Sequence, residues 1–363
     1  MRICFFLGGL TGNGGIGRAT SVLANSLVNQ PDLEIFILSY ADTHKPRLYQ
    51  LDERIRTHIL FPNPISMKNA VLHNIVGKLK KYLVDNRIDV ILACGSLYFP
   101  ATVQACKGIA AKCICWDHTA PRVNTDHAFQ AWSRKYGAKH SDINAVLTKR
   151  AKEYYDANFG RADRNRLMYN PIDPAAVEKR KPYCADAKRI ITVGRLTYPK
   201  NMELLIRVAD KVLKANPDWT WDVYGDGELQ EKLQTQIDAC GIGNQLTLKG
   251  KVSDIYDRYG SYSFKVLTSR YEGFPMTLLE ASANGLPMVS FDVETGPNEI
   301  IENGVNGFLL PPEDEEAMCK AIETLMHDSA LRCAMSEASA KTSERFQIDA
   351  ICEQWRALFQ EMR

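Results

Sequence analysis

Two glutamates eight positions apart, Glu272 and Glu280, have the residue type and spacing that most clearly indicate chemistry in this sequence. An apolar run at 264–268 predicts a strand before them, and apolar residues at helical spacing follow. Glu272 is therefore expected in a strand-to-helix loop, and Glu280 about one turn into the helix. Pro275 suits the first helical position, and Gly273 lets a ligand approach the backbone. Because the free N–H groups of a helix start bind anions, the loop could hold a sugar phosphate whose hydroxyls contact the carboxylates.

A family resemblance rests on the same residues. The segment 269–310 resembles the retaining glycosyltransferase family 4 of the GT-B fold, whose signature is this glutamate pair; the Gly-Leu-Pro at 285–287 and the Gly-Pro-Asn-Glu at 296–299 fit as well. The resemblance implies two doubly wound Rossmann-like α/β domains facing each other across a cleft, and transfer from a nucleotide-diphosphate sugar without a metal. From the residues alone, the alternative is a surface helix start whose glutamates complement the helix dipole. The resemblance gives the donor sugar to Glu272, the ribose to Glu280, and the diphosphate to the segment of Gly273, Phe274, Pro275, Met276 and Thr277.

Two cations, Arg195 and Lys200, stand five positions apart between an expected strand and an expected helix. Both can contact one diphosphate, the arginine as a planar fork and the lysine as a point charge. The resemblance gives them that role, in which they offset the charge of the leaving diphosphate. The alternative is two exposed loop cations. The resemblance also places Gly225 near the nucleotide and Lys249 and Val252 in the segment beside the base, although both segments could be scaffold.

The glycine-rich turn after the first expected strand has two functional interpretations. The Gly-x-Gly-x-x-Gly at 12–17 matches the dinucleotide-binding fingerprint, and Asp42 lies near the acid that this fingerprint requires. The family resemblance instead assigns Gly15, Gly17 and Arg18 to the wall across the cleft from the donor, near its phosphates. A tight strand-to-helix connection without a ligand is the third possibility.

His118 follows an expected strand and has Asp117 beside it. A lone histidine is more often structural, but the resemblance places a histidine here against the transferred sugar. Cys113 and Cys115 could suggest a metal site with His118. Strand alternation puts both thiols on one face, and no Cys-x-x-Cys pair occurs elsewhere, so no metal is predicted. The ten cysteines indicate small buried side chains in a reducing compartment.

The chain length predicts more than one domain, because 363 residues exceed the ~250–300 at which a single core stops growing. With 45% hydrophobic and 24% charged residues the composition is that of a soluble globular protein, and no apolar run approaches the ~18 residues of a membrane span. We predict an acceptor-side domain at 1–172 and a donor-side domain at 173–343, joined by the proline-broken stretch 170–182. The resemblance returns a final helix, in 344–363, to the first domain.

Strand and helix patterns alternate along both halves, which predicts parallel sheets with ligands at the carboxyl ends of the strands. In the first half, strands are expected at 2–7, 33–39, 90–94, 112–116 and 143–147, the last closing the set, and helices at 16–27 and 71–84. In the second half, strands are expected at 189–193, 219–224, 246–249, 264–268, 288–291 and 308–310, and helices at 201–214, 229–240 and about 348–362.

Charge is distributed unevenly along the sequence. Residues 1–170 carry ten more basic than acidic side chains and residues 171–363 carry eight more acidic than basic, which gives the net charge of +2. The stretch 69–87 predicts a basic amphipathic helix, which can lie on an anionic membrane surface or present a solvated face. The basic half favours an anionic partner, and we predict no nucleic-acid partner.

The sequence therefore predicts a retaining, metal-independent glycosyltransferase, with a UDP-sugar as donor on family frequency and no cofactor. Its acceptor would be a saccharide or lipid-linked saccharide of cell-surface glycan synthesis, and the protein would be cytoplasmic, on the inner face of the membrane or free of it. The alternatives are a GT-B-fold UDP-sugar epimerase, an NAD-dependent oxidoreductase supported by the first glycine loop, and a non-catalytic sugar-binding protein. The predicted catalytic residues are His118, Arg195, Lys200 and Glu272.

Overall fold

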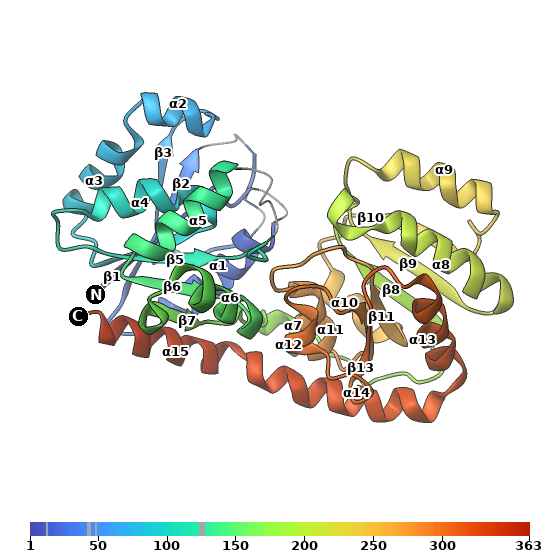
Figure 1. Cartoon of the computed structure of the whole chain (residues 1–363). Helices are drawn as coiled ribbons and strands as arrows, with labels where there is room; N and C mark the ends of the chain where they lie inside the picture. Colours follow the sequence, from blue (N-terminus) through green and yellow to red (C-terminus); the bar gives the residue numbers. More distant parts are fainter. Residues whose placement is uncertain (12–13, 42–44, 48, 123–127) are drawn as a thin grey trace. The chain divides into compact units, whose positions relative to one another are not determined.

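The computed structural model describes residues 1–11, 14–41, 45–47, 49–122 and 128–363. It divides the chain into two compact domains, a first made of 1–171 with 348–363 and a second made of 172–347 (Figure 1). The predicted linker is not unstructured, because a short helix, α7 (Pro174–Glu178), lies within it. Gly12 and Asp42, which the dinucleotide interpretation needs, lie outside the described residues.

The first domain contains a parallel sheet of seven strands in the order β3-β2-β1-β4-β5-β6-β7. Successive strands are added on one side of β1 and then, from β4, on the other. In such a sheet the crevice for a ligand lies at the carboxyl ends of the two strands where the order reverses, here β1 and β4. The strands are β1 (Arg2–Leu7), β2 (Glu34–Ala41), β3 (Arg56–Phe61), β4 (Val90–Cys94), β5 (Lys112–Asp117), β6 (Ile143–Val146) and β7 (Asn165–Leu167).

The helices of the first domain correct one prediction. A single helix at 71–84 was expected, and the structure has two, because Asn74 takes a left-handed conformation (φ 55°) and its side chain accepts the N–H of Gly77 at 3.0 Å. Strands β3 and β7 were not expected. The prediction that 143–147 is the last strand of the first domain is therefore wrong. The helices are α1 (Gly15–Leu27), α2 (Met67–Leu72), α3 (Ile75–Asp85), α4 (Phe99–Cys106), α5 (Ala128–His140), α6 (Lys149–Phe159) and α15 (Ile348–Glu361).

The C-terminal helix α15 is part of the first domain and packs against α1 (Figure 1). Its Trp355 is fully buried and meets Trp116 of β5 edge-on, with 5.0 Å between ring centres. The thiol of Cys352 lies 2.9 Å from the hydroxyl of Ser26 in α1. The last helix therefore covers one face of the first sheet.

The second domain repeats the architecture with six parallel strands in the order β10-β9-β8-β11-β12-β13. The order reverses between β8 and β11, so the crevice of this sheet lies where those two strands end. The strands are β8 (Arg189–Val193), β9 (Thr220–Tyr224), β10 (Leu246–Gly250), β11 (Phe264–Leu267), β12 (Met288–Phe291) and β13 (Gly307–Leu310). The helices besides α7 are α8 (Met202–Ala215), α9 (Gln230–Cys240), α10 (Ile255–Arg258), α11 (Met276–Ala283), α12 (Pro297–Ile300), α13 (Glu315–His327) and α14 (Ser329–Ser343).

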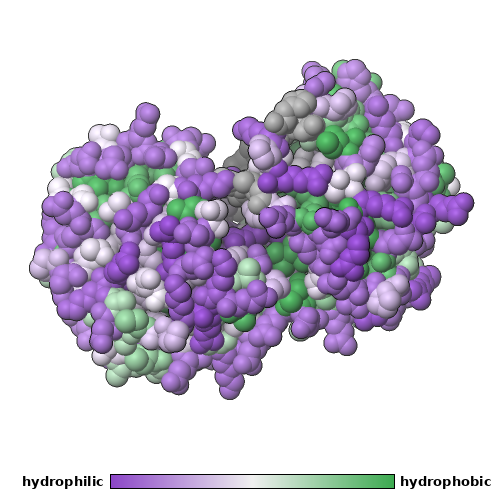
Figure 2. Space-filling view, turned by 180° about the vertical axis from the view of Figure 1, so that it is seen from behind, coloured by the Kyte–Doolittle hydropathy of each residue, from purple (hydrophilic) through white to green (hydrophobic). Residues whose placement is uncertain are grey.

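The surface is mostly hydrophilic on the face shown in Figure 2, where hydrophobic residues form small separate areas. Among the described residues, no helix combines the length and the apolar character that crossing a bilayer requires. The face shown in Figure 2 has no broad apolar area.

The packing of α15 makes a testable prediction about stability. Replacing the buried Trp355 by alanine should lower the free energy of unfolding of the first domain by about 3–5 kcal/mol, because it leaves a large cavity under Trp116. Urea unfolding followed by far-UV circular dichroism measures the loss. Trp132→Ala is the matched control, since that indole is 49% exposed and its loss should cost far less. Equal losses in the two variants would contradict the prediction.

Candidate active site

Two loops leave the central strands of the second sheet and meet through an ion pair. Lys200 follows β8, Glu272 follows β11, and the ammonium lies 2.5 Å from the carboxylate oxygen Oε1. The hydroxyl of Ser269 donates to the same oxygen at 2.7 Å. Both charged side chains are largely buried, so the pair fixes the carboxylate of Glu272 at the crevice of the sheet.

Backbone contacts hold the same two loops together. The hydroxyl of Thr268 donates to the carbonyl of Lys200 at 3.0 Å, and the N–H of Arg270 donates to the carbonyl of Pro199 at 2.9 Å. The ion pair therefore connects two loops that are also hydrogen-bonded to each other through their backbones.

Arg195 and Lys200 differ in their surroundings, although the sequence predicted one role for both. Arg195 is exposed, and its guanidinium has no carboxylate partner among the described residues. Its charge acts on the neighbouring Tyr271, where it opposes the rise in pKa that burial causes. The site thus contains one cation already paired with Glu272 and a second whose charge is uncompensated.

The start of α11 supplies backbone donors beside the ion pair. Pro275 was predicted to be the first residue of the helix, but it is the residue immediately before it. Its carbonyl accepts the N–H of Leu278 at 2.9 Å. In the described part of the chain, the N–H groups of Gly273, Met276 and Thr277 donate to no other group. These three amides are therefore available to an anion, the kind of group that the start of a helix can bind.

The side chain of Phe274 serves the core rather than a ligand. It is 5% exposed and meets Phe346 edge-on, with 5.5 Å between ring centres. Of the remaining segment, Met276 is buried and Thr277 half-buried, so the segment presents mainly its backbone.

Behind the loop, Glu280 is 1% exposed and accepts the hydroxyl of Tyr259 at 2.9 Å. Lys265 of β11 is fully buried nearby, and its ammonium has no hydrogen-bond partner among the described residues. Burial lowers the pKa of Lys265 to about 7, while the charge of Glu280 opposes that shift. The sequence analysis missed Lys265 as a site residue, and its signal was a lysine inside an otherwise apolar strand.

The backbone at position 225 requires a glycine. Its φ is +143°, and an added Cβ would lie 1.9 Å from the carbonyl oxygen of Gly194, so only glycine allows the loops after β8 and β9 to touch. Lys249 lies 3.4 Å from the carboxylate of Asp222, and Val252 is half-buried. These residues lie at the carboxyl ends of β9 and β10, and the contacts described are scaffold contacts.

In the first domain His118 lies just after β5, buried against the ring of Trp116 at 4.2 Å between ring centres. Burial lowers the pKa of His118 to about 3, against the opposing charge of Asp117, so the imidazole is neutral near pH 7. A neutral imidazole can donate or accept one hydrogen bond but supplies no positive charge.

A buried network around Asp117 holds the loop that carries His118. Its carboxylate accepts Arg134 Nε at 2.7 Å, the hydroxyl of Tyr155 at 2.7 Å and the hydroxyl of Thr119 at 2.9 Å. Arg134 also donates to Thr119. Because several donors satisfy the buried carboxylate, it fixes the loop instead of destabilising it.

A hollow of about 460 Å³ lies at the crevice of the first sheet. Gly17 lines it from the glycine loop and Thr119 from the loop of His118, whereas Gly15 and Arg18 belong to the same helix start but are not among the lining residues. The other lining residues are Leu7, Gly8, Gly9, Thr11, Gly14, Ile16, Cys94, Gly95, Ser96, Leu97, Tyr98 and Gln130.

Within the described ranges, no group of three or more His, Cys, Asp and Glu side chains is placed to hold a metal ion. Cys113 and Cys115 are both buried in the core on one face of β5.

Comparison with known proteins gives related results for both halves. Residues 13–176 match the family described as Glycosyltransferase Family 4, and residues 178–342 match Glycosyl transferases group 1. An uncharacterized glycosyltransferase of Haemophilus influenzae is 26% identical over 357 residues, which cover 98% of this chain and 99% of that protein. The amylovoran biosynthesis glycosyltransferase AmsD of Erwinia amylovora is 26% identical over 368 residues, covering 98% of each. The solved structure of HepE from Anabaena with UDP and glucose has a TM-score of 0.81 at 19% identity over 98% of this chain and 99% of that one, a likeness of fold.

The buried Lys265 predicts a pH dependence of stability. Its pKa is lowered from the usual 10.5 to about 7 in the folded state, so the unfolded chain binds more protons between those values. The free energy of unfolding should therefore rise with pH across that window, and Lys265→Met should remove this rise and stabilise the domain most at pH 7 and below.

Thermal unfolding of wild type, Lys265→Met and the exposed control Lys214→Met at several pH values between 7 and 10 measures the effect. If the difference in thermal stability between the wild type and Lys265→Met does not change with pH, the prediction is wrong.

Proposed function

We propose that this chain, which belongs to the glycosyltransferases of the GT-B fold, moves a sugar from a UDP-sugar to a saccharide or lipid-linked saccharide, with retention of configuration and without a metal. The observation that carries the proposal is the arrangement at the crevice of the second sheet. There the Lys200–Glu272 pair, the uncompensated Arg195 and the free amides of α11 lie on two joined loops.

The two cations and the start of α11 would bind the donor's diphosphate. Arg195 has an unpaired charge, and Lys200 can share its charge between Glu272 and a phosphate oxygen. These positive groups would stabilise the leaving diphosphate, which is the role that a metal ion has in other transferases. Glu280 would hold the ribose hydroxyls, and the name of the HepE complex supports UDP as the nucleotide.

The surroundings of Glu272 agree with the retaining course that we propose, in which no side chain attacks the sugar. Its carboxylate already binds an ammonium and a hydroxyl, which makes it a hydrogen-bond acceptor for sugar hydroxyls and a poor nucleophile. In the proposed step, the bond between the anomeric carbon and the phosphate oxygen breaks, and the acceptor oxygen bonds to that carbon on the same face. The acceptor proton passes to the leaving phosphate oxygen, while the neutral His118 offers a hydrogen bond to the sugar.

The acceptor would occupy the hollow of about 460 Å³ at the crevice of the first sheet, between the glycine loop and the loop of His118. The name of AmsD refers to amylovoran biosynthesis, and that of the structural neighbour WaaB to the lipopolysaccharide outer core, which together support a role in bacterial cell-surface glycan synthesis.

Peripheral contact with an anionic membrane is proposed at the end of α2. Val71 and Leu72 are 64% and 76% exposed there, and Lys68 is exposed one turn earlier. Lys80 and Lys81 of α3 are less suited, because Lys80 donates to the carbonyl of Lys107 and Lys81 pairs with Asp85 at 2.8 Å. An apolar pair beside a cation can insert into the interface of a bilayer.

Removing either donor cation should reduce turnover strongly. Arg195→Ala and Lys200→Ala should each lower kcat by about 10² or more, since each removes a preorganised charge at the leaving group. Transfer from UDP-sugars to acceptors from bacterial glycan extracts, with EDTA present, measures the effect. Lys214→Ala, which removes an exposed cation of α8, should leave kcat unchanged.

Calorimetric binding of UDP, GDP, ADP and NAD with EDTA identifies the nucleotide. Tight binding of UDP that Glu280→Ala weakens is expected. Binding of NAD alone would contradict the transferase proposal and favour the dinucleotide interpretation of the first glycine loop. Release of epimerised UDP-sugar without transfer would favour an epimerase.

The membrane proposal predicts that specific substitutions in α2 reduce binding to anionic vesicles. Leu72→Ser combined with Val71→Ser should greatly reduce cosedimentation with vesicles that contain anionic phosphatidylglycerol, because it removes the inserting apolar pair. Val305→Ser in the second domain, where the side chain is 46% exposed, should not. Equal binding by both variants would overturn this assignment.

A further inference from the structure

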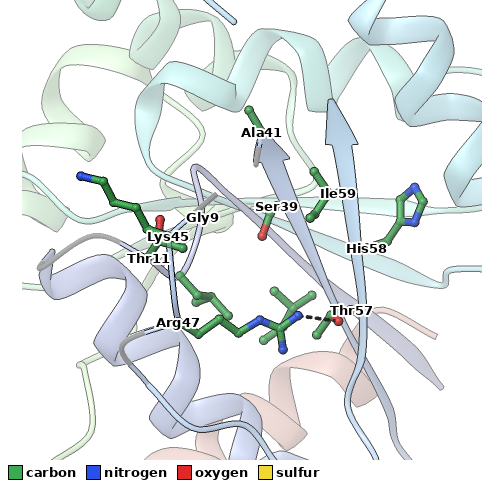
Figure 3. Close-up of a pocket in the computed structure, with 11 residues that line it drawn as sticks. Gly9, Thr11, Ser39, Ala41, Lys45, Arg47, Thr57, His58 and Ile59 are labelled. Atoms are coloured by element: carbon green, nitrogen blue, oxygen red, sulfur yellow. Dashed lines mark hydrogen bonds between the residues drawn. The ribbon is translucent and has the colours of Figure 1, made fainter. Parts of the chain in front are cut away.

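The first domain contains a second, smaller pocket of about 210 Å³ beside the acceptor hollow. It lies over the edge of the sheet formed by β2 and β3, and Figure 3 shows its residues. Gly9 and Thr11 line both this pocket and the larger hollow, so the two adjoin along the loop after β1. The polar side chains among the other described lining residues are Ser39, Lys45, Arg47, Thr57 and His58.

The lining residues give this pocket a positive character. Arg47 extends across it to β3 and donates to the hydroxyl of Thr57 at 2.9 Å (Figure 3), a neutral partner that leaves the guanidinium charge uncompensated. Lys45 is exposed and forms no ion pair with a carboxylate that the structure describes. None of the lining residues that the structure describes is an acid. The hydroxyl of Ser39 on β2 adds a polar group to the same wall.

Among the described residues, the acids Asp52 and Glu34 have partners of their own and do not neutralise these two cations. Asp52 pairs with Arg54 at 2.7 Å. Glu34 lies 3.4 Å from Arg2 and 3.6 Å from Arg56. The ring of His58 stacks on that of Tyr82, with 5.1 Å between ring centres.

We propose that this pocket binds an oxyanion, a phosphate or a carboxylate, carried by the acceptor glycan, with Arg47 and Lys45 as its charge partners. The inference rests on the proposed function and names the chemical class of its acceptor. A guanidinium fork suits the two oxygens of either anion, and nearby hydroxyls can complete the hydrogen bonds.

Size and position favour an acceptor group over a nucleotide. About 210 Å³ lies below the ~300–1,000 Å³ of sites that enclose a drug-sized ligand, so one charged group or one sugar ring fits. Because the pocket adjoins the larger hollow, an acceptor sugar in that hollow can place its own or a neighbouring anionic group against Arg47. The rival occupant is the 2′-phosphate of NADP, which an arginine near the end of the second strand holds in dinucleotide-binding domains.

Calorimetry on the full chain tests the proposal with glucose 6-phosphate, glucuronic acid and glucose as probes. One or both charged sugars should bind where glucose does not, and the stronger of the two distinguishes phosphate from carboxylate. Arg47→Gln should weaken that binding by about tenfold or more and Lys45→Gln by less, as expected for charge-assisted hydrogen bonds. Lys139→Gln, an exposed lysine at the end of α5, is the matched control and should change nothing.

Several outcomes would overturn the proposal: no binding of either charged sugar, equal binding of glucose, an equal loss in Lys139→Gln, or tighter binding of NADP than NAD that Arg47→Gln removes. UDP binding, measured on the same samples, should be unchanged in every variant because its proposed site is in the second domain. If the wild type binds UDP but neither charged sugar, this inference is refuted and the proposed function is not. Failure of the wild type to bind UDP would instead count against the proposed function.

Discussion

The ion pair between Lys200 and Glu272 joins the two loops that leave the central strands of the second sheet. Parallel strands bring these loops together at the point where strand order reverses, but the sheet alone does not fix their side chains. The pair does so, because a charge with little access to water must keep its partner. Ser269 is then held by the carboxylate, and Thr268 by the carbonyl of Lys200. The free amides of α11 begin directly after this anchored segment.

The two domains satisfy buried charge to different degrees. Asp117 in the first domain accepts hydrogen bonds from an arginine, a tyrosine and a threonine, so its burial is compensated. Lys265 in the second has charged neighbours but no hydrogen bond to any group the structure describes. Its burial therefore costs stability beneath the proposed donor site. Such a cost is common where a protein keeps polar groups poised for a ligand instead of for the core.

The strands with continuous apolar runs were predictable, and β1, β4, β8 and β12 have the predicted bounds because both faces of a parallel strand are buried. Strand β3 was missed because it lies at the sheet edge, where Arg56 and His58 are exposed and interrupt the run. The helix break at Asn74 depends on a left-handed backbone that helical spacing does not reveal. Candidate residues in loops could be named from motifs, but their partners could not: Arg134 and Tyr155 reach Asp117 from 17 and 38 positions away.

The course of the chain through the two domains also sets an order of synthesis. Helix α15 belongs to the first domain, yet the ribosome makes it after the whole of the second. At ~5–20 residues per second, this interval lasts on the order of ten seconds or more. During it the indole of Trp116, on which His118 rests, lacks its cover by Trp355. A nascent chain can thus complete the second domain first, and the first domain reaches its final packing only when the last helix docks.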